Sequence, residues 1–248
     1  MIEQLILKIK RGETPFYRTV RSFIRKGMHS TLPVPKFFYP VLRLLYHTHF
    51  AVLFMARWLL NYFYREPLFR SRCVSIGEGF HMWLMPDITG HPKIVIGSHV
   101  NFFGHAAITS GRIFDEPRLV IGDRVDLGHN IVIVVNKEVI IEEGVKIASG
   151  CRFMDTDAHP RDTMARVSNL PPPPDEVKPV RICRNAWIGQ NSFILKGVTV
   201  GEGAVIGVNS VVVTDVPPFS VAMGNPARVV VKNPASVPQT GSPAKTSA

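Results

Sequence analysis

The residues best suited to chemistry lie in the segment Asp155-Thr156-Asp157-Ala158-His159-Pro160. Histidine commonly serves as a general base because its ordinary pKa lies near neutrality. A neighbouring carboxylate can hold one imidazole tautomer through a hydrogen bond. The spacing therefore indicates His159 as a candidate base and Asp157, or else Asp155, as the acid that orients it. The alternative is a histidine that is simply exposed in a loop.

A six-residue period surrounds this segment. Aliphatic or Phe residues recur at Ile96, Phe102, Ile108, Ile121, Leu127, Ile133, Ile141, Ile147, Phe153, Ile182, Ile188, Ile194, Val200, Ile206 and Val212. The fifth position of these hexads is usually small or branched. Neither the helical period of 3.6 nor the strand period of 2 produces such a repeat, whereas a β-helix does. A β-sandwich is the alternative, but the hairpin turns that it needs are scarce.

Three hexads can close one triangular coil of eighteen residues. The coils are expected to start at Ile76, Ile96, Ile121, Ile141, Ile182 and Val200, in steps of 20, 25, 20, 41 and 18 residues. The small excesses over eighteen predict enlarged corners, and the excess of 23 predicts a loop over residues 154–181. His159 follows Phe153 by six residues, where the chain leaves the coil. The period therefore predicts that the candidate base lies at the start of the longest loop.

The chain is expected to have three parts: a basic, apolar helical segment (1–75), the β-helix (76–232) and a disordered tail (233–248) rich in Pro, Ser and Ala. Residues 1–75 hold thirteen Lys or Arg against three Glu, which accounts for the whole net charge of +10. No nucleic-acid-reading motif accompanies this charge, so we expect no nucleic-acid partner.

The stretch from Phe37 to Tyr64 is the most apolar part of the chain. Its longest uncharged run, residues 44–56, is shorter than the roughly 18–20 residues of a spanning helix. Cations mixed with Phe, Trp and Tyr favour peripheral contact with a membrane surface. Capping of the β-helix and a true membrane span are the alternatives.

Cysteine usage and the N-terminus bear on the compartment. Cys73, Cys151 and Cys183 have no metal-ligand spacing and are odd in number, which favours a reducing compartment. The start of the chain lacks the apolar run of a signal peptide. We therefore expect a cytoplasmic protein, at the inner face of the cytoplasmic membrane if the basic segment contacts lipid.

Three features together are more specific than the hexads: the segment 155–160, the segment 179–212, and Gly224-Asn225-Pro226-Ala227-Arg228-Val229. On these features, residues 94–232 resemble the hexapeptide-repeat acyltransferases, similar to the maltose, galactoside and polysaccharide O-acetyltransferases. The resemblance implies an all-β fold, a left-handed parallel β-helix of about six coils behind an N-terminal α-helical segment. It also implies a homotrimer with active sites between subunits and His159 as the catalytic base.

The resemblance further implies acetyl-coenzyme A, or another acyl-coenzyme A, as co-substrate, with no metal required. Backbone groups around Gly189 and Gly207 would pair with the pantetheine arm, and Arg228 and Lys232 would contact the phosphates. Many relatives have a Lys where this chain has Thr214, so phosphate recognition is expected to differ.

The acceptor implied by the resemblance is a saccharide hydroxyl in polysaccharide or lipid-linked saccharide biosynthesis. Where relatives have Asn-Phe-Asn or Asn-Phe-Asp, this chain has Gly128-His129-Asn130, so only Asn130 matches. Asp155 and Trp187 are the other candidate acceptor contacts. Transfer to nitrogen and longer acyl donors remain open.

Two other functions are compatible with this fold. A γ-class carbonic anhydrase needs three His on a metal ion, but His99 and His105 are one hexad apart and so point from different faces of the coil. A non-enzymatic scaffold would not need the segment that carries His159.

Overall fold

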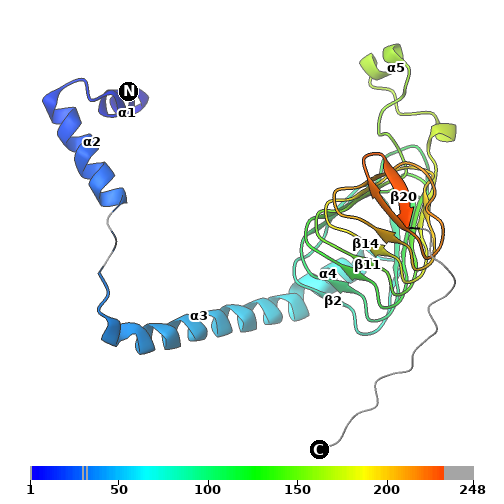
Figure 1. Ribbon diagram of the computed structural model, residues 1–248, viewed down its shortest axis with the longest axis horizontal. Helices are drawn as coiled ribbons and strands as arrows, with labels where there is room; N and C mark the ends of the chain where they lie inside the picture. The colour runs from blue at the N-terminus through cyan, green and yellow to red at the C-terminus, as the bar shows by residue number, and fades with distance from the viewer. Residues whose placement is uncertain (1, 30, 32, 232–248) are drawn as a thin grey trace, which may run out of the picture. The chain divides into compact units, whose positions relative to one another are not determined.

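A computed structural model describes residues 2–29, 31 and 33–231 of the 248-residue chain (Figure 1). The chain divides into two compact units between Met55 and Ala56. The second unit contains the hexads and is built around a parallel β-helix. Lys232 and the predicted disordered tail lie outside the described residues.

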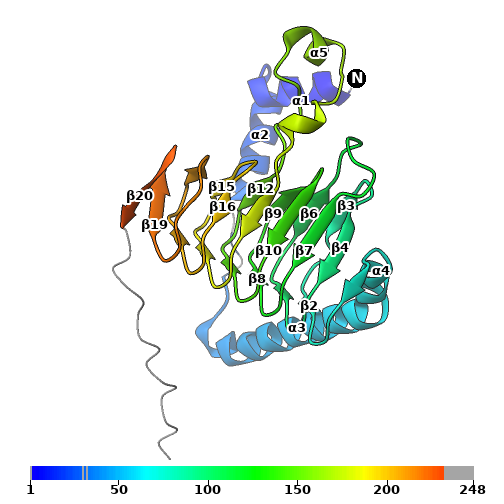
Figure 2. The same ribbon diagram turned by 90° about the vertical axis from the view of Figure 1, so that its right-hand side faces the viewer.

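Each coil of the β-helix contributes one strand to each of three sheets (Figure 2). The first sheet consists of β1 (Ser75–Ile76), β4 (Lys93–Ile96), β7 (Arg118–Ile121), β10 (Glu138–Ile141), β13 (Val180–Ile182) and β16 (Thr199–Val200). The second consists of β2 (His81–Met82), β5 (Asn101–Phe102), β8 (Asp126–Leu127), β11 (Lys146–Ile147), β14 (Trp187–Ile188), β17 (Val205–Ile206), β19 (Val221–Gly224) and β20 (Ala227–Val231). The third consists of β3 (Asp87–Thr89), β6 (Ala106–Thr109), β9 (Ile131–Val134), β12 (Arg152–Met154), β15 (Phe193–Ile194) and β18 (Val211–Val212). The expected fold class, a left-handed parallel β-helix of six coils with N-terminal helices, is confirmed.

The strand register follows the hexads. The six expected coil starts pair in parallel from one coil to the next, and Ile141 pairs with Ile182 across the longest interruption. All fifteen hexad residues from Ile96 to Val212 are at most 4% exposed. Each buried aliphatic side chain contributes about 1.5–3 kcal/mol, so stacked coils accumulate the stability that one coil lacks.

The candidate site residues lie mostly at two corners of the coil. We call the turn between the second and third sheets the second corner, and the turn from the third sheet to the next coil the third corner. At the second corner Asn130, Asn191 and Asn209 all have a φ of 56°, the left-handed conformation that Asn tolerates better than most residues. Asn130 is therefore accounted for by the corner itself.

Both long interruptions leave the coil at the third corner. Residues 110–117 separate β6 from β7, and residues 155–179 separate β12 from β13. The second interruption holds α5 (Thr163–Val167) and the 3₁₀ turn η3 (Pro174–Glu176), and Figure 2 shows it projecting beyond the strands. The Asp162 side chain caps α5 by accepting the Ala165 N–H at 2.7 Å.

The first coil is covered by the end of the helical segment. This end consists of the π-helical turn η2 (Asn61–Arg65) and α4 (Glu66–Ser71). Phe69, in α4, is 2% exposed and stacks on Phe80 at 5.6 Å between ring centroids. The compact units therefore divide about twenty residues before the expected boundary at residue 75, because Phe69 belongs to the core. The capping alternative holds for this part of the segment.

The other helices have no buried residue. They are α1 (Ile2–Arg11), α2 (Pro15–Met28), the 3₁₀ turn η1 (Lys36–Phe38) and α3 (Tyr39–Leu60). Among the described residues, no helix has both the length and the hydropathy to cross a bilayer.

Candidate active site

His159 lies at the third corner of the fourth coil, six residues beyond the buried Phe153. Its side chain is exposed and lines a cavity of about 270 Å³. The other walls come from residues 109–113 in the first interruption and 169–172 in the second. The two interruptions therefore enclose one cavity, with the candidate base on its surface. The sequence did not predict that residues 110–113 of the first interruption line this cavity.

A buried carboxylate fixes the point where the chain leaves the coil. Asp155 is 0% exposed and accepts the backbone N–H groups of Asn136 at 2.9 Å, Lys137 at 2.6 Å and Glu138 at 3.0 Å. Burial raises the pKa of the Asp155 carboxyl, and these N–H groups oppose the rise. Asp155 was expected to contact the acceptor or the imidazole, but it lies inside the coil. Its carboxylate instead ties the base of the loop to the preceding coil.

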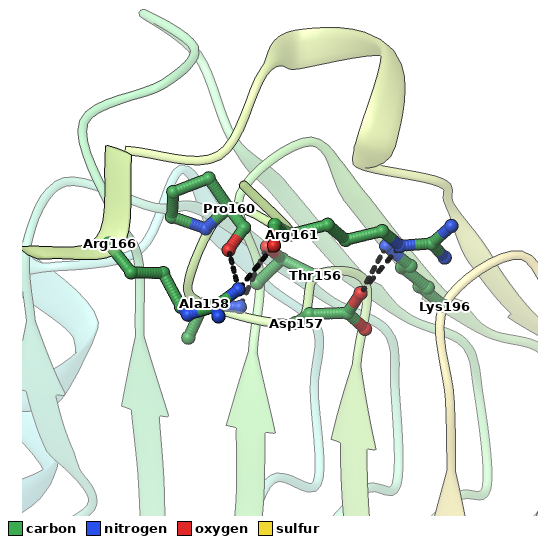
Figure 3. A network of polar contacts seen from close by, with 7 residues as sticks. All are labelled: Thr156, Asp157, Ala158, Pro160, Arg161, Arg166 and Lys196. Atoms are coloured by element: carbon green, nitrogen blue, oxygen red, sulfur yellow. Dashed lines mark hydrogen bonds and ion pairs between the residues drawn. The ribbon is translucent and has the colours of Figure 1, made fainter. Parts of the chain in front are cut away.

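A tight turn then presents His159. The Thr156 hydroxyl oxygen accepts the Ala158 N–H at 3.1 Å, and Ala158 has a φ of 65°. Pro160 is buried directly after the histidine. The Arg166 guanidinium donates to the Pro160 carbonyl at 3.0 Å, which links α5 to this turn (Figure 3). The imidazole therefore extends from a fixed backbone.

The Asp157 carboxylate has cationic partners in place of the expected imidazole. Its carboxylate pairs with Lys196 Nζ at 2.5 Å and lies 4.0 Å from Arg161 Nε (Figure 3). The Lys196 side chain is only 12% exposed and comes from the next coil. The orienting hydrogen bond from the His159 imidazole N–H to the Asp157 carboxylate is not formed in this structure. Lys196 was missed because its partner is 39 residues away, and only stacking of the coils brings the two together.

The predicted coenzyme A glycines lie at the second corner. The Gly189 N–H donates to the Ile206 carbonyl and the Gly207 N–H to the Ala222 carbonyl, both at 2.8 Å. A Cβ on Gly189 would lie 2.5 Å from that Ile206 oxygen. Coil packing therefore explains these glycines, and their N–H groups are already used. Pairing of the pantetheine arm with other backbone groups around these glycines stays a prediction.

The remaining predicted contacts are spread over the β-helix. Trp187, on β14, is 56% exposed. Arg228, on β20, is exposed and donates to the Ala227 carbonyl at 2.9 Å. Asn130 lies at the second corner, whereas His159 lies at the third. One chain therefore does not bring all the predicted residues together.

The histidines considered for a metal have other neighbours. His105 Nε2 lies 2.8 Å from Asp87, His91 Nε2 lies 3.1 Å from the Phe114 carbonyl oxygen, and His99 Nε2 lies 3.9 Å from Glu78. In the described part of the chain, no three His, Cys, Asp or Glu side chains are grouped closely enough to hold a metal ion.

Comparison with known proteins agrees with the expected resemblance. Residues 179–214, which form the last two coils, match the family described as bacterial transferase hexapeptide (six repeats). A Mycobacterium tuberculosis protein named as a probable acetyltransferase is 32% identical over 158 residues, which are 63% of this chain and 49% of that protein. A Saccharomyces cerevisiae protein with the provisional name acetyltransferase is 38% identical over 114 residues, which are 46% of this chain and 56% of that protein. The chain thus spans about half the length of these curated relatives.

Solved structures show the same fold. A variant of an N-acyltransferase from Bacillus cereus, in complex with dTDP and coenzyme A, superposes with a TM-score of 0.52 at 18% identity. The superposition covers 68% of this chain and 89% of that one. At this identity the likeness concerns the fold alone.

Proposed function

We propose that this hexapeptide-repeat protein is an acetyl-coenzyme A-dependent acetyltransferase that esterifies a saccharide hydroxyl, with His159 as general base. One observation carries the proposal: an exposed imidazole on a fixed turn borders the cavity where both interruptions of the coil meet. Positioned histidines of this kind perform proton transfer in acyl-transfer enzymes. The acetyltransferase names of the sequence relatives support the same reaction class.

In the proposed reaction the His159 imidazole accepts the proton of the acceptor hydroxyl while the oxygen attacks the thioester carbonyl carbon. Backbone N–H groups stabilise the resulting oxyanion. When the tetrahedral intermediate collapses, the carbon–sulfur bond breaks and the thiolate receives the proton from the imidazolium. The products are an acetyl ester and coenzyme A, and His159 returns to its neutral form.

One charged residue, Arg228, is a candidate contact for the acetyl-coenzyme A donor. The Arg228 guanidinium is exposed, and the described residues give it no acidic partner, so it is available to a coenzyme A phosphate. Longer acyl donors are compatible with the same position. Lys232 was the second candidate for this contact.

We also propose a homotrimer. His159 lies at the third corner, whereas Asn130 lies at the second, and a symmetric ring can bring unlike corners of two subunits together. We expect light scattering to give about three times the chain mass of 27.7 kDa. A monomer that acetylates at the full rate would contradict a site shared between subunits.

We propose further that the enzyme acts at the inner face of the cytoplasmic membrane, on a growing polysaccharide or lipid-linked saccharide, and the basic segment, residues 1–75, supports this proposal. In α1 and α2 apolar residues recur on one helical stripe: Ile2, Leu5, Ile6 and Ile9, then Phe16, Tyr17, Val20, Phe23, Ile24 and Met28. The two helices border an apolar groove of about 610 Å³ edged by Lys10, Arg21 and Arg25. Cationic helices with such stripes bind anionic interfaces.

We therefore expect the chain to co-sediment with phosphatidylglycerol vesicles and much less with phosphatidylcholine vesicles. Each neutralised cation should weaken binding about fivefold, from about 1 kcal/mol per charge, so the double variant Arg21→Gln/Arg25→Gln should bind more than tenfold less tightly. The control Arg118→Gln removes a charge from the β-helix instead. Recovery of the parent in the supernatant with both lipids at low salt would contradict membrane contact.

The reaction is tested by thiol release from acetyl-coenzyme A over a panel of sugars that includes amino sugars. An ester product identifies transfer to oxygen, and an amide product identifies transfer to nitrogen. A scaffold would release no thiol with any acceptor. A γ-class carbonic anhydrase would instead hydrate CO₂ and lose activity to chelators.

A further inference from the structure

A second cavity lies at the second corner, beside the stretch Gly128-His129-Asn130. Its volume is about 560 Å³, and its lining residues are Arg57, Trp83, Leu84, Phe103, Gly104, Gly128, His129 and Ser149. These residues come from the end of α3 and from the first four coils. The lining contains two cationic or titratable nitrogen groups and two aromatic rings, but no carboxylate.

The end of the helical segment is fixed against the first coil. Asn61 Nδ2 donates to the Met82 carbonyl at 2.8 Å, and Arg65 donates to Asn61 Oδ1 at 3.2 Å. Arg57 precedes Asn61 by four residues and so lies on the same helical face. This clamp holds the Arg57 guanidinium at the cavity, and the described residues give it no ion-pair partner.

The opposite wall is equally fixed. The His129 N–H donates to the Ser149 hydroxyl at 3.0 Å, and the His129 carbonyl accepts the Gly150 N–H at 2.7 Å. A Cβ on Gly104 would lie 2.3 Å from His129 Nδ1, so the absence of that side chain leaves room for the imidazole. The ring therefore has a defined place beside Phe103, which is 41% exposed.

We propose that this cavity binds the acceptor as a phosphorylated saccharide. Trp83 and Phe103 offer apolar faces for a sugar ring, as large aromatic side chains do. Arg57 presents a planar donor fork that matches a phosphate, and the His129 imidazole adds a further donor. Since no lining carboxylate opposes an anion, the charge favours a phosphate over a cationic group.

This inference rests on the proposed function because it names the class of acceptor. It also rests on the proposed homotrimer, in which the second corner of one subunit would face His159 at the third corner of another. Binding is nevertheless measured without acetyl-coenzyme A, so the experiment can contradict the proposed acceptor site without contradicting the proposed reaction. Isothermal titration of the full-length parent should detect glucose 1-phosphate and give at least tenfold weaker binding for glucose, which lacks the phosphate. Glycerol 3-phosphate, which resembles a lipid headgroup, should also bind at least tenfold more weakly because it lacks the sugar ring.

Arg57→Gln should weaken glucose 1-phosphate binding about tenfold or more. His129→Gln should weaken it less, and Arg118→Gln on β7 should leave it unchanged. Equal affinity for glucose, equal affinity for glycerol 3-phosphate, no effect of Arg57→Gln, or no binding by the folded parent would each overturn the proposal. Activity that still depends on His159 in any of these cases would leave the proposed reaction intact.

Discussion

Replacing His159 with Ala should lower the rate constant kcat of acetyl transfer by about 10²–10⁴-fold, the contribution typical of a positioned general base. The side chain is exposed, so its removal should take away the proposed proton acceptor without disturbing the coil. The measurement is thiol release at saturating acetyl-coenzyme A with the most active sugar of the panel.

The matched control is His99→Asn. His99 is also exposed, but it lies at a different corner with a φ of 57°, which Asn tolerates. This variant should keep the parental rate, and both variants should keep the parental melting temperature. Undiminished turnover by His159→Ala would contradict the assigned role.

Asp155→Ala should lower the free energy of unfolding by roughly 3 kcal/mol or more. The substitution leaves three backbone N–H groups without their carboxylate acceptor, and a buried unsatisfied donor costs about 1–3 kcal/mol. The loss should also release the base of the His159 loop. Urea denaturation of the parent and the variant measures the difference.

Two controls separate this effect from a general loss of charge. Asp162→Ala removes an exposed cap of α5 and should cost about 1 kcal/mol. Asp155→Asn keeps one acceptor oxygen, so its free energy of unfolding should lie between those of Asp155→Ala and the parent. If Asp155→Ala is no more destabilising than Asp162→Ala, the buried carboxylate does not hold the loop.

Much of the fold could be predicted because burial repeats along the chain. The spacing of Ile141 and Ile182 indicated that they belong to successive coils even though a loop separates them, and they are paired. The small fifth positions are buried for the same reason, as Cys151 and Ser192 illustrate. A solenoid stacks nearest neighbours, so counting hexads gives its register.

The division between the compact units could not be predicted from hydropathy. Phe69 lies in an apolar segment full of exposed aromatic residues, and nothing in its spacing separates it from them. It is buried because it packs on Phe80 of the first coil and Phe102 of the second coil at the open end of the β-helix. Which aromatic residue covers the exposed end of the β-helix depends on the path of the chain from α3 through η2 to α4.

The polar partners of the site residues also could not be predicted from the sequence. Asp155 and Asp157 look equivalent beside His159, yet one carboxylate turns inward to residues 136–138 and the other pairs with Lys196. The difference arises because β12 ends at Met154 and the turn over Thr156 and Ala158 redirects the chain after Asp155, which the motif does not encode. The close approach of Gly189 and Gly207 to the next coil could not be predicted for a similar reason, since it is a property of stacking.

The central claim is that the chain transfers an acetyl group to a saccharide oxygen. The most direct measurement supplies ¹³C-labelled acetyl-coenzyme A with the sugar panel and locates the label in the product by NMR. The parent should form a labelled acetyl ester on a sugar, and His159→Ala should form none that is detectable. Label found only as free acetate, or an equal yield of ester from both proteins, would contradict it.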